Sequence, residues 1–304
     1  MASTSRGNNR TGLDLRVLRY FIAVAEEGNI TWAADLLQIS QPTLSRQLRG
    51  MERSLGVRLF DRSTHAMTLT AEGRLLYDRA KTLVALADKT VQDVHSAQGG
   101  LSGTVTLACG ETRNLPWVLD RMASFRKINP NVQFSVLTYT ADIAKAQLDQ
   151  GILDLAILVE PVSVENYDYI RLNKHDIWCV TVPESSPLAQ LDHIEPKHLS
   201  GQTLLLPARP EVQREVMNWL GTYADSISIA GTCNFNLNGN LMVAAGLGMR
   251  IGFDMGHEVY GTKNIPLNPP VETTCLLAWR RGRILAPAAS AFTEYVFEAL
   301  HHDN

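Results

Sequence analysis

The chain has no run of 18 apolar residues, so the sequence predicts no transmembrane helix and no membrane partner. Its start, MASTSRGNNRTG, is polar and lacks the apolar core of a secretory signal. We therefore expect a flexible tail over residues 1–12 and a cytoplasmic protein. Only four cysteines occur among the 304 residues, and none belongs to a Cys-x-x-Cys pair or a Cys/His cluster: Cys109, Cys179, Cys233 and Cys275. The sequence predicts no metal site and no disulfide framework, and we expect buried reduced thiols.

Motifs for catalysis and nucleotide binding are also lacking. No Gly-x-Gly-x-x-Gly or Walker loop follows a predicted strand, and AAGLGMRIG ends a helix before it starts a strand, the wrong order for a phosphate cradle. No nucleophile elbow, His/Asp constellation or metal-ligand spacing occurs. The sequence predicts no enzyme, no catalytic residue and no cofactor. An enzyme built on the C-terminal part, with the N-terminal part as an accessory, remains the alternative.

What the chain does contain is an uneven distribution of charge. Its formal net charge is −3, with 45% hydrophobic and 19% charged residues, a composition typical of a soluble protein with two or three compact units. Residues 1–74 hold ten Lys/Arg against seven Asp/Glu, whereas residues 75–304 hold eighteen against twenty-four. A basic N-terminal part on an acidic remainder indicates that only the N-terminal part meets a polyanion.

Three apolar periodicities predict three helices near the start of the chain. LDLRVLRYFIAVAEEG is one-faced and ends at Gly28, and ITWAADLLQIS follows with Thr31 as a possible cap. In SQPTLSRQLRGMERSLG, Ser40 is a natural N-cap and Pro42 occupies the first turn, where its missing N–H costs nothing. The inward positions of this third helix are Leu44, Leu48, Met51 and Leu55.

The outward face of the third helix is polar and cationic. It carries Gln41, Ser45, Arg46 and Arg49, flanked by Thr43 and Arg53. Arginine and glutamine donors can read guanine and adenine edges, and hydroxyl groups reach bases or phosphates. A short helix, a tight turn and a second helix with such a face predict a helix-turn-helix. The alternative is an ordinary surface helix that happens to carry three arginines.

A pair of short strands is predicted directly after this helix. Gly56 ends the helix, and VRLFDRSTHAMTLT then reads as two strands around a polar turn. Arg62 and His65 at the tip would reach a DNA backbone or minor groove. His65 has no partner nearby that would make it a metal ligand.

Residues 18–73 resemble the winged helix-turn-helix of the LysR-type transcriptional regulators. The family pattern is matched at Phe21, Val24, Ala25, Ala33, Ala34, Ser40, Gln41, Pro42, Ser45, Leu55, Gly56, Leu59, Phe60, Arg62, Leu69, Thr70 and Gly73, with mild departures at Asn29 and Met51. The resemblance implies a double-stranded DNA operator as partner. It assigns Arg62 to the wing, Gln41 and Arg46 to base contacts and Arg49 to phosphate, and the full expected DNA-binding set is Thr31, Gln41, Pro42, Thr43, Ser45, Arg46, Arg49 and Arg62.

A long helix is predicted to connect this domain (13–70) to the rest of the chain. Residues 71–98 contain no proline, and apolar or small residues recur at spacings of four and three: Leu76, Ala80, Leu83, Ala87, Thr90 or Val91, and Val94. Such a heptad seam is typical of paired helices, so we expect a dimer-forming linker about 42 Å long. A single helix packed on its own domain is the alternative. GGLSG at 99–103 then predicts a hinge.

The remainder, 104–304, alternates predicted strands and helices, which indicates an α/β fold with mainly parallel sheets. This part is similar to the effector-binding domain of the same family, which has the two-lobed fold of type 2 periplasmic binding proteins. The resemblance implies a first lobe of 104–168 with 271–304 and a second of 169–270. A transport-type solute-binding protein would suit this fold too, but the helix-turn-helix argues against it.

The resemblance also implies a small-molecule effector between the lobes. The segment CGETRN, 109–114, joins a strand to a helix, where free N–H groups favour a small anion. Within it, Glu111, Thr112, Arg113 and Asn114 are the expected contacts, with Cys109 at the pocket mouth as a possible thiol sensor. The resemblance implies further effector contacts with a looser match to the family: Thr140, Arg209, Asn236 and Asn238 before a helix, and Phe253.

Together these features predict a sequence-specific, effector-responsive transcriptional regulator with an α/β body and an N-terminal winged helix-turn-helix. The effector is expected to be anionic, and its identity is open. The resemblance implies RNA polymerase as a further partner, and it implies that the homodimers pair into homotetramers. The seam itself indicates only the dimer.

Overall fold

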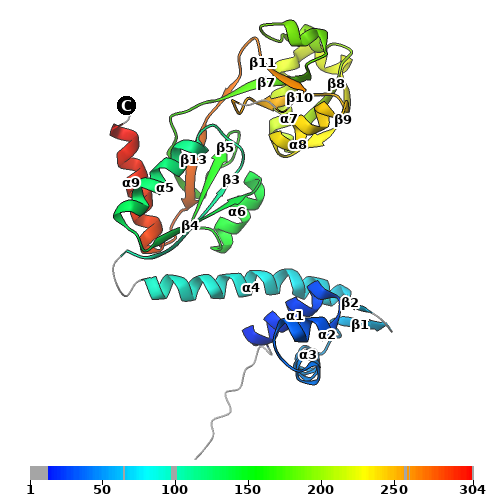
Figure 1. Ribbon diagram of the computed structural model, residues 1–304, viewed down its shortest axis with the longest axis vertical. Coiled ribbons are helices and arrows are strands. Elements are labelled where there is room, and N and C mark those ends of the chain that lie inside the picture. The colour runs from blue at the N-terminus through cyan, green and yellow to red at the C-terminus, as the bar shows by residue number, and fades with distance from the viewer. Residues whose placement is uncertain (1–12, 64–65, 97–100, 257–258, 260, 303–304) are drawn as a thin grey trace, which may run out of the picture. The chain divides into compact units, whose positions relative to one another are not determined.

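The computed structural model describes residues 13–63, 66–96, 101–256, 259 and 261–302. It divides the chain into two compact units, Met1–Val91 and Gln92–Asn304, which are described separately below (Figure 1). No helix in the described part of the chain is long and apolar enough to span a bilayer.

The first unit has three short helices, a hairpin and most of a long helix. In chain order these are α1 (Leu15–Glu27), α2 (Ile30–Leu36), α3 (Gln41–Leu55), β1 (Phe60–Ser63), β2 (Ala66–Leu69) and α4 (Ala71–Ser96). The two strands pair antiparallel, with Phe60 opposite Leu69 and Arg62 opposite Met67. The helix-turn-helix with a following hairpin is therefore present as predicted. The hairpin tip with His65, and residues 97–98 of the predicted linker, lie outside the described residues.

Helix capping in this unit differs from the prediction at two positions. The N-cap of α2 is Asn29, not Thr31, because the Asn29 side chain accepts from the N–H groups of Thr31 (2.8 Å) and Trp32 (3.2 Å). Ser40 does hold the N-cap position of α3, but its hydroxyl lies 2.8 Å from the Thr43 hydroxyl and makes no capping bond. An amide oxygen reaches two free donors, whereas the Ser40 hydroxyl is engaged by its neighbour.

The core of the first unit forms where the three helices and the hairpin meet. Leu44, Leu48 and Met51 are buried as the periodicity predicted, and the rings of Phe21 and Phe60 pack at 5.2 Å. A buried carboxylate ties α3 to the hairpin. The Glu52 side chain accepts hydrogen bonds from the backbone N–H of Leu59 (2.9 Å) and of Phe60 (3.4 Å). The orientation of the hairpin relative to α3 thus depends on a charged group inside the domain.

The predicted seam of α4 divides into two parts. Its first part packs within the unit, since Ala80 is fully buried and Leu76 lies against the same core. Farther along, Leu83, Val91 and Val94 are 42%, 56% and 60% exposed. The alternative of a helix packed on its own domain therefore holds for the first turns, whereas the later seam residues are exposed in the single chain.

The second unit contains two sheets with helices around them. The elements that precede the second sheet are β3 (Gly103–Cys109), α5 (Leu115–Ile128), β4 (Val132–Thr138), α6 (Ala141–Gln150), β5 (Leu155–Val159) and β6 (Tyr167–Arg171). There follow β7 (Asp176–Pro183), β8 (Thr203–Pro207), α7 (Pro210–Leu220), β9 (Ser228–Cys233), α8 (Asn236–Ala244), β10 (Met249–Phe253), β11 (Thr262–Pro266), β12 (Glu272–Thr273), β13 (Cys275–Arg280) and α9 (Pro287–His302). Three 3-10 helices lie at Pro187–Gln190, Pro196–Leu199 and Gly221–Ser226.

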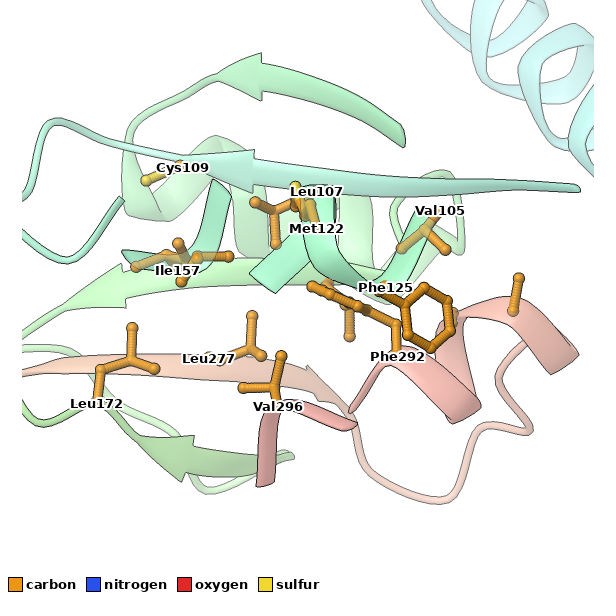
Figure 2. Close-up of a cluster of buried hydrophobic side chains, with 14 of the residues drawn as sticks. Val105, Leu107, Cys109, Met122, Phe125, Ile157, Leu172, Leu277, Phe292 and Val296 are labelled. Carbon is orange, nitrogen blue, oxygen red and sulfur yellow. The ribbon is translucent and has the colours of Figure 1, made fainter. Parts of the chain in front are cut away.

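The first sheet has the strand order β4-β3-β5-β13-β6. Helices α5 and α9 cover one face, where aliphatic strand residues meet Phe125 and Phe292, whose rings are 5.4 Å apart (Figure 2). On the opposite face, α6 contributes Ala144 and Leu148 to a second, smaller core. Because both faces are covered, the central strands β5 and β13 are nearly continuous apolar runs.

The second sheet has the order β11-β7-β10-β8-β9, with β12 beside β7. Both sheets combine parallel and antiparallel pairs, so the prediction of mainly parallel sheets is wrong: β13 runs antiparallel to β5 and β6, and β7 to β10 and β11. The chain passes from the first sheet to the second between Arg171 and Asp176, and returns before Cys275. Both crossings lie a few residues after the predicted lobe limits at 168 and 270.

Three further details depart from the predicted elements. Helix α8 starts at Asn236, so that Asn236 and Asn238 lie inside the helix and not before it. Strands β6 and β11 were missed, because YDYIR and TKNIP are too polar to give an apolar run. Gly103, the last residue of the predicted hinge, starts β3, and residues 97–100 lie outside the described part.

Candidate functional site

One face of the first unit is a shallow, strongly cationic groove along α3. Its lining comprises Gln41, Pro42, Ser45, Arg46, Arg49, Glu52, Arg53, Gly56, Val57 and Arg58. Arg46, Arg49, Arg53 and Arg58 are exposed, whereas Glu52, the only acid of the lining, is buried and bonded to backbone amides. The groove therefore presents four guanidinium groups, which suits a surface that binds the phosphates of a nucleic acid.

The residues predicted to contact DNA lie mostly on this face. Gln41, Pro42, Thr43, Arg46 and Arg49 are exposed and Ser45 is half-buried on α3, while Thr31 is exposed in the first turn of α2. Arg62 belongs to β1, but its side chain lies outside the described residues. Sequence reasoning missed Arg58, which precedes the hairpin.

The second unit contains a cleft lined by residues of both sheets and enclosing ≈ 800 Å³, part of it open to solvent. The first sheet and its loops contribute Gly110, Glu111, Tyr139, Thr140, Ala141, Ile157, Val159 and Glu160. The second sheet contributes Trp178, Pro207, Ala208, Arg209, Val212, Cys233, Asn234, Phe235, Asn236, Arg250, Ile251, Gly252 and Phe253. Its lining is mainly apolar and aromatic with a few polar and charged groups, which is typical of sites for small molecules.

Arg250 of β10 is the most unusual residue of the cleft wall. Its side chain is 98% buried, at 2% exposure, and every hydrogen-bond partner is neutral. Nε donates to Asn240 Oδ1 (2.7 Å), Nη1 to Asn236 Oδ1, and Nη2 to the Thr181 hydroxyl (2.9 Å) and the Phe253 carbonyl (3.2 Å). Among the residues that the structure describes, no carboxylate forms an ion pair with it. A guanidinium is a cation, so the wall carries a positive charge.

Two glycines provide the space for this arginine. A Cβ at Gly239 would lie 2.3 Å from Cδ of Arg250 and 2.7 Å from Sγ of Cys233. A Cβ at Gly252, which lines the cleft, would lie 2.0 Å from Nη1 of Arg250. Any side chain at either position would displace the guanidinium, so the sequence around Arg250 is built to accommodate it.

Glu111 connects the two sides of the cleft. It follows β3, and its carboxylate accepts hydrogen bonds from the backbone N–H of Asn236 and of Leu237 (3.3 Å) in the first turn of α8. A helix N-terminus favours a carboxylate, because its first N–H groups lack partners within the helix. Asn236 thus meets Glu111 through its backbone and Arg250 through its side chain.

Arg209 is the second cation of the cleft. It occupies the N-cap position of α7, and its Nη2 donates to the Pro161 carbonyl (3.0 Å) across the cleft. Its Nε is buried without a hydrogen-bond partner among the described residues and lies 3.8 Å from Oδ2 of Asp142. Thr140 caps α6 by position without a side-chain capping bond. Three helices therefore begin at the cleft, beside two arginines.

Aromatic rings form the remaining wall. Trp178 and Phe253 pack edge to face with centroids 5.1 Å apart, and Tyr139 and Phe235 line the same space. A ligand in this cleft would therefore contact an apolar surface as well as cations. Of the residues predicted to contact an effector, Phe253, Thr140, Arg209, Asn236 and Glu111 line the cleft.

The other predicted effector residues lie elsewhere. Thr112 and Asn114 are buried at 1% and 2% exposure, and the Thr112 hydroxyl donates to Asp176 (2.6 Å). The backbone N–H of Arg113 also donates to Asp176 (2.6 Å), and its side chain lines a separate surface depression. Asn238 is exposed on α8. Asp176, at the start of β7, thus fixes the loop after β3, a role that the sequence did not reveal.

Cys109 does not lie at the mouth of the cleft. It is 97% buried in the core of the first sheet and is absent from the cleft lining. Burial, together with the nearby charge of Asp176, raises the pKa of its thiol from 9.0 to about 12. A thiol that stays protonated is a poor nucleophile, which argues against a sensor at this position. All four cysteines are free, and Cys233 is the one that is only half-buried.

Several cleft residues were not predicted from the sequence, although one of them, Arg250, stands in a sequence context that could have identified it. Arg250 interrupts the apolar strand MRIGF, and a charge inside a buried strand marks a special environment. Tyr139, Trp178 and Phe235 had no signal, because an aromatic residue at a strand end is indistinguishable in sequence from ordinary core.

A helix-turn-helix unit with an arginine-rich groove, joined to a two-sheet α/β unit with a cleft lined from both sheets, defines the class of DNA-binding regulators controlled through a second domain. Sequence comparison gives the family. Residues 15–74 match the model of the bacterial regulatory helix-turn-helix protein, lysR family, and residues 98–301 match the LysR substrate binding domain. The chain belongs to the LysR family of DNA-binding transcriptional regulators, and it is not an enzyme.

Individual relatives agree with this assignment. The uncharacterized HTH-type transcriptional regulator YybE of Bacillus subtilis is 28% identical over 92% of this chain and 96% of its own. The Hca operon transcriptional activator HcaR of Escherichia coli is 28% identical over 95% and 98%. The fold resembles the crystal structure of CbnR, a LysR family transcriptional regulator, with a TM-score of 0.76 at 23% identity, covering 95% of this chain and 99% of that one.

Proposed function

We propose that this regulator binds a twofold DNA operator through the α3 face and is controlled by a small organic anion held in the cleft of its second unit. The observation that supports the ligand most directly is the pair of arginines in one cleft wall. Arg250 is buried with neutral partners, and Arg209 has a buried Nε that makes no hydrogen bond in the described part and lies 3.8 Å from the exposed Asp142 carboxylate. Burying the Arg250 cation without an acid is unfavourable, and an anionic ligand would offset that cost.

We assign DNA contacts to the residues predicted from the sequence. Gln41 and Arg46 would read base edges, and Arg49 would contact phosphate, with Thr31, Pro42, Thr43, Ser45 and Arg62 contributing to the same interface. To these we add Arg58, on the strength of its place in the groove. The expected location is the cytoplasm, where the DNA is.

The exposed residues of α4 support a dimer. Leu83, Val91 and Val94 follow the seam spacing and are exposed in the single chain. Pairing two α4 helices would bury them and place two α3 helices on one DNA, because twofold operators match twofold proteins. Pairing of dimers into tetramers and contact with RNA polymerase remain expectations from the family.

Control of DNA binding requires only that the anion bind one conformation of the second unit more tightly than another. The cleft suits this role, since Glu111 and Arg209 already make hydrogen bonds across it. A ligand that changes these contacts would change the relative placement of the two sheets and, through α4, of the paired DNA-binding units.

The DNA part of the proposal is tested with Arg46→Ala in the full chain, by a mobility-shift assay on the DNA upstream of the regulator's own gene and of its neighbours. We expect specific binding by the wild type and its loss in the variant. Arg16→Ala removes the same charge from an exposed position of α1 and should bind like the wild type. Equal binding by Arg46→Ala and the wild type would refute the assignment of α3.

The ligand part is tested by thermal shift of the full chain against a library of small carboxylates, each paired with its neutral amide. A carboxylate at 100 times its Kd stabilises by about 2.7 kcal/mol, which raises the Tm of the second unit by about 5–10 °C. Arg209→Gln should reduce the shift. If amides shifted the Tm as much as their carboxylates did, the ligand would not be an anion.

A further inference from the structure

Of the charged residues that face the cleft, some have an oppositely charged partner and others do not. Two acids line it, Glu111 and Glu160. Glu160 has its own cation, since both of its oxygens bond to Arg171 at 3.0 and 3.3 Å. Burial opposes its ionisation, but hydrogen bonds from Thr274 and Arg171 outweigh burial and lower its pKa. Glu111 forms no ion pair among the described residues, and its hydrogen-bond donors are two backbone N–H groups.

Arg250 and Glu111 are the two charges without an oppositely charged partner, and Asn236 lies between them. The Asn236 side-chain oxygen accepts from Nη1 of Arg250, while its backbone N–H donates to Glu111. The half-buried thiol of Cys233 lines the same wall. Burial raises its pKa most, while the charge of Arg250 lowers it and that of Glu111 raises it. Asp254, the acid nearest in sequence to Arg250, bonds instead to the Gly256 N–H (2.9 Å) and to Asn264 (3.3 Å).

We propose that Glu111 is an internal ligand of the cleft: its carboxylate occupies the place, beside Arg250 and the first turn of α8, that a carboxylate group of the effector takes. The inference rests on the proposed function and specifies it. The bound effector must carry a carboxylate, and it must displace Glu111 from the N–H groups of Asn236 and Leu237.

The position of Glu111 explains why displacement would act as a switch. Glu111 belongs to the loop after β3 of the first sheet, and α8 packs on the second sheet. The contact therefore holds the two sides of the cleft together while no effector is bound. A free carboxylate can satisfy the same N–H groups without being attached to the first sheet, so that binding releases one cross-cleft contact.

The same geometry sets the specificity. The N–H groups of the α8 turn and the fixed charge of Arg250 favour an acceptor with negative charge, whereas a neutral amide gains little there. The carboxylate of Glu111 is held at high local concentration, so only ligands with further contacts, such as those to the aromatic wall, would compete effectively. Glu111 thus sets a threshold below which simple metabolite acids leave the protein unchanged.

The experiment measures amide hydrogen exchange by mass spectrometry in the full-length protein, for the peptide that contains Asn236 and Leu237. In Glu111→Ala we expect exchange at these amides to rise roughly tenfold or more, because a charged acceptor is lost. Sodium acetate should then slow the exchange again, while acetamide should not. Wild-type protein should show no change with acetate. Glu165→Ala, which removes an exposed acid after β5, should behave like the wild type.

Three outcomes would overturn the inference: unchanged exchange in Glu111→Ala, protection by acetate as strong in the wild type as in the variant, or no protection by acetate in either. If Glu111→Ala fails to fold, Glu111→Gln takes its place, with exchange between that of the wild type and that expected for alanine. The readout involves no DNA. If one of these three results is found but a small-molecule effector does change DNA binding, only the role of Glu111 is refuted. If acetate protects the variant as expected but no effector changes DNA binding, the proposed control of DNA binding is refuted.

Discussion

A substitution of Gly239 by alanine tests whether the space around Arg250 is as tight as the structure shows. Gly239 lies in α8, and a side chain added there would point at the methylene chain of Arg250 and the thiol of Cys233. A helix interior normally favours alanine over glycine by about 1 kcal/mol. At this position the added methyl group would meet Cδ of Arg250 at 2.3 Å and Sγ of Cys233 at 2.7 Å.

Both contacts are far inside van der Waals separation, so one group must move. Arg250 cannot shift freely, because four hydrogen bonds to three residues and a carbonyl hold its guanidinium. Overpacking of a filled interior costs about 1–3 kcal/mol, and movement of the guanidinium would break charged hydrogen bonds of similar value. We expect Gly239→Ala to destabilise the second unit by about 1–3 kcal/mol net of its helix propensity.

The assay is thermal unfolding followed by calorimetry, in which a loss of this size lowers the Tm of a unit of this length by roughly 2–12 °C. Gly50→Ala is the matched control. Gly50 also lies inside a helix, α3, but a Cβ there would meet nothing within 4 Å. It should stabilise the first unit by about 0.5–1 kcal/mol. The reasoning is refuted if Gly239→Ala leaves the Tm of the second unit unchanged or raises it.

Three further predictions concern other parts of the chain. Glu52→Ala removes the acceptor of two buried N–H groups and should destabilise the first unit by about 1–3 kcal/mol in urea unfolding, whereas the exposed Glu27→Ala should have little effect. The Cys109 thiol has a folded-state pKa of about 12 against 9.0, so its contribution to stability is complete below pH 9 and lost as the pH rises toward 12. It should resist iodoacetamide at pH 8 until the protein unfolds. Leu83→Glu should convert the proposed dimer to monomers in sedimentation equilibrium.

Each of these has an outcome that would contradict it. A Glu52→Ala protein as stable as wild type would mean that water replaces the carboxylate. Rapid labelling of native Cys109 at pH 8 would show that the thiol is accessible. The control for Leu83→Glu is Leu75→Glu, an exposed position of α4 outside the seam, which should leave the dimer intact. Dimers in both variants would place the interface away from α4.

The sequence was sufficient for the elements whose patterns are local. The helix over α3 and its buried face followed from a period that any amphipathic helix shows. The N-cap of α2 was harder to predict, because Asn29 and Thr31 are both good N-cap residues. Only the geometry of the turn selects Asn29. Strand β6 escaped because its alternation, YDYIR, resembles an exposed polar segment.

The cleft was predictable as a place but not as a set of contacts. The strand-to-helix segment pointed to Glu111, and the family resemblance pointed to Thr140, Arg209 and Phe253; all four line it. Thr112 lies in the same strand-to-helix segment as Glu111, but its side chain is buried. Its hydroxyl donates a hydrogen bond to Asp176, 64 residues later. No pattern within a single segment reveals such a pairing. The residue that dominates the electrostatics of the wall, Arg250, sits inside a strand and not in a loop.

The strand order of the first sheet also affects how the chain can fold during its synthesis on the ribosome. Strand β13 lies between β5 and β6, yet it is the last strand to leave the ribosome, about a hundred residues after both. Until then β5 and β6 have no partner between them, and the backbone edge of β5 that β13 later pairs with stays open while the whole second sheet can already form. A nascent chain of this kind depends on protection during synthesis. A truncation before Cys275 would likewise remove the middle of a sheet, and the first lobe would be lost although most of its residues remained.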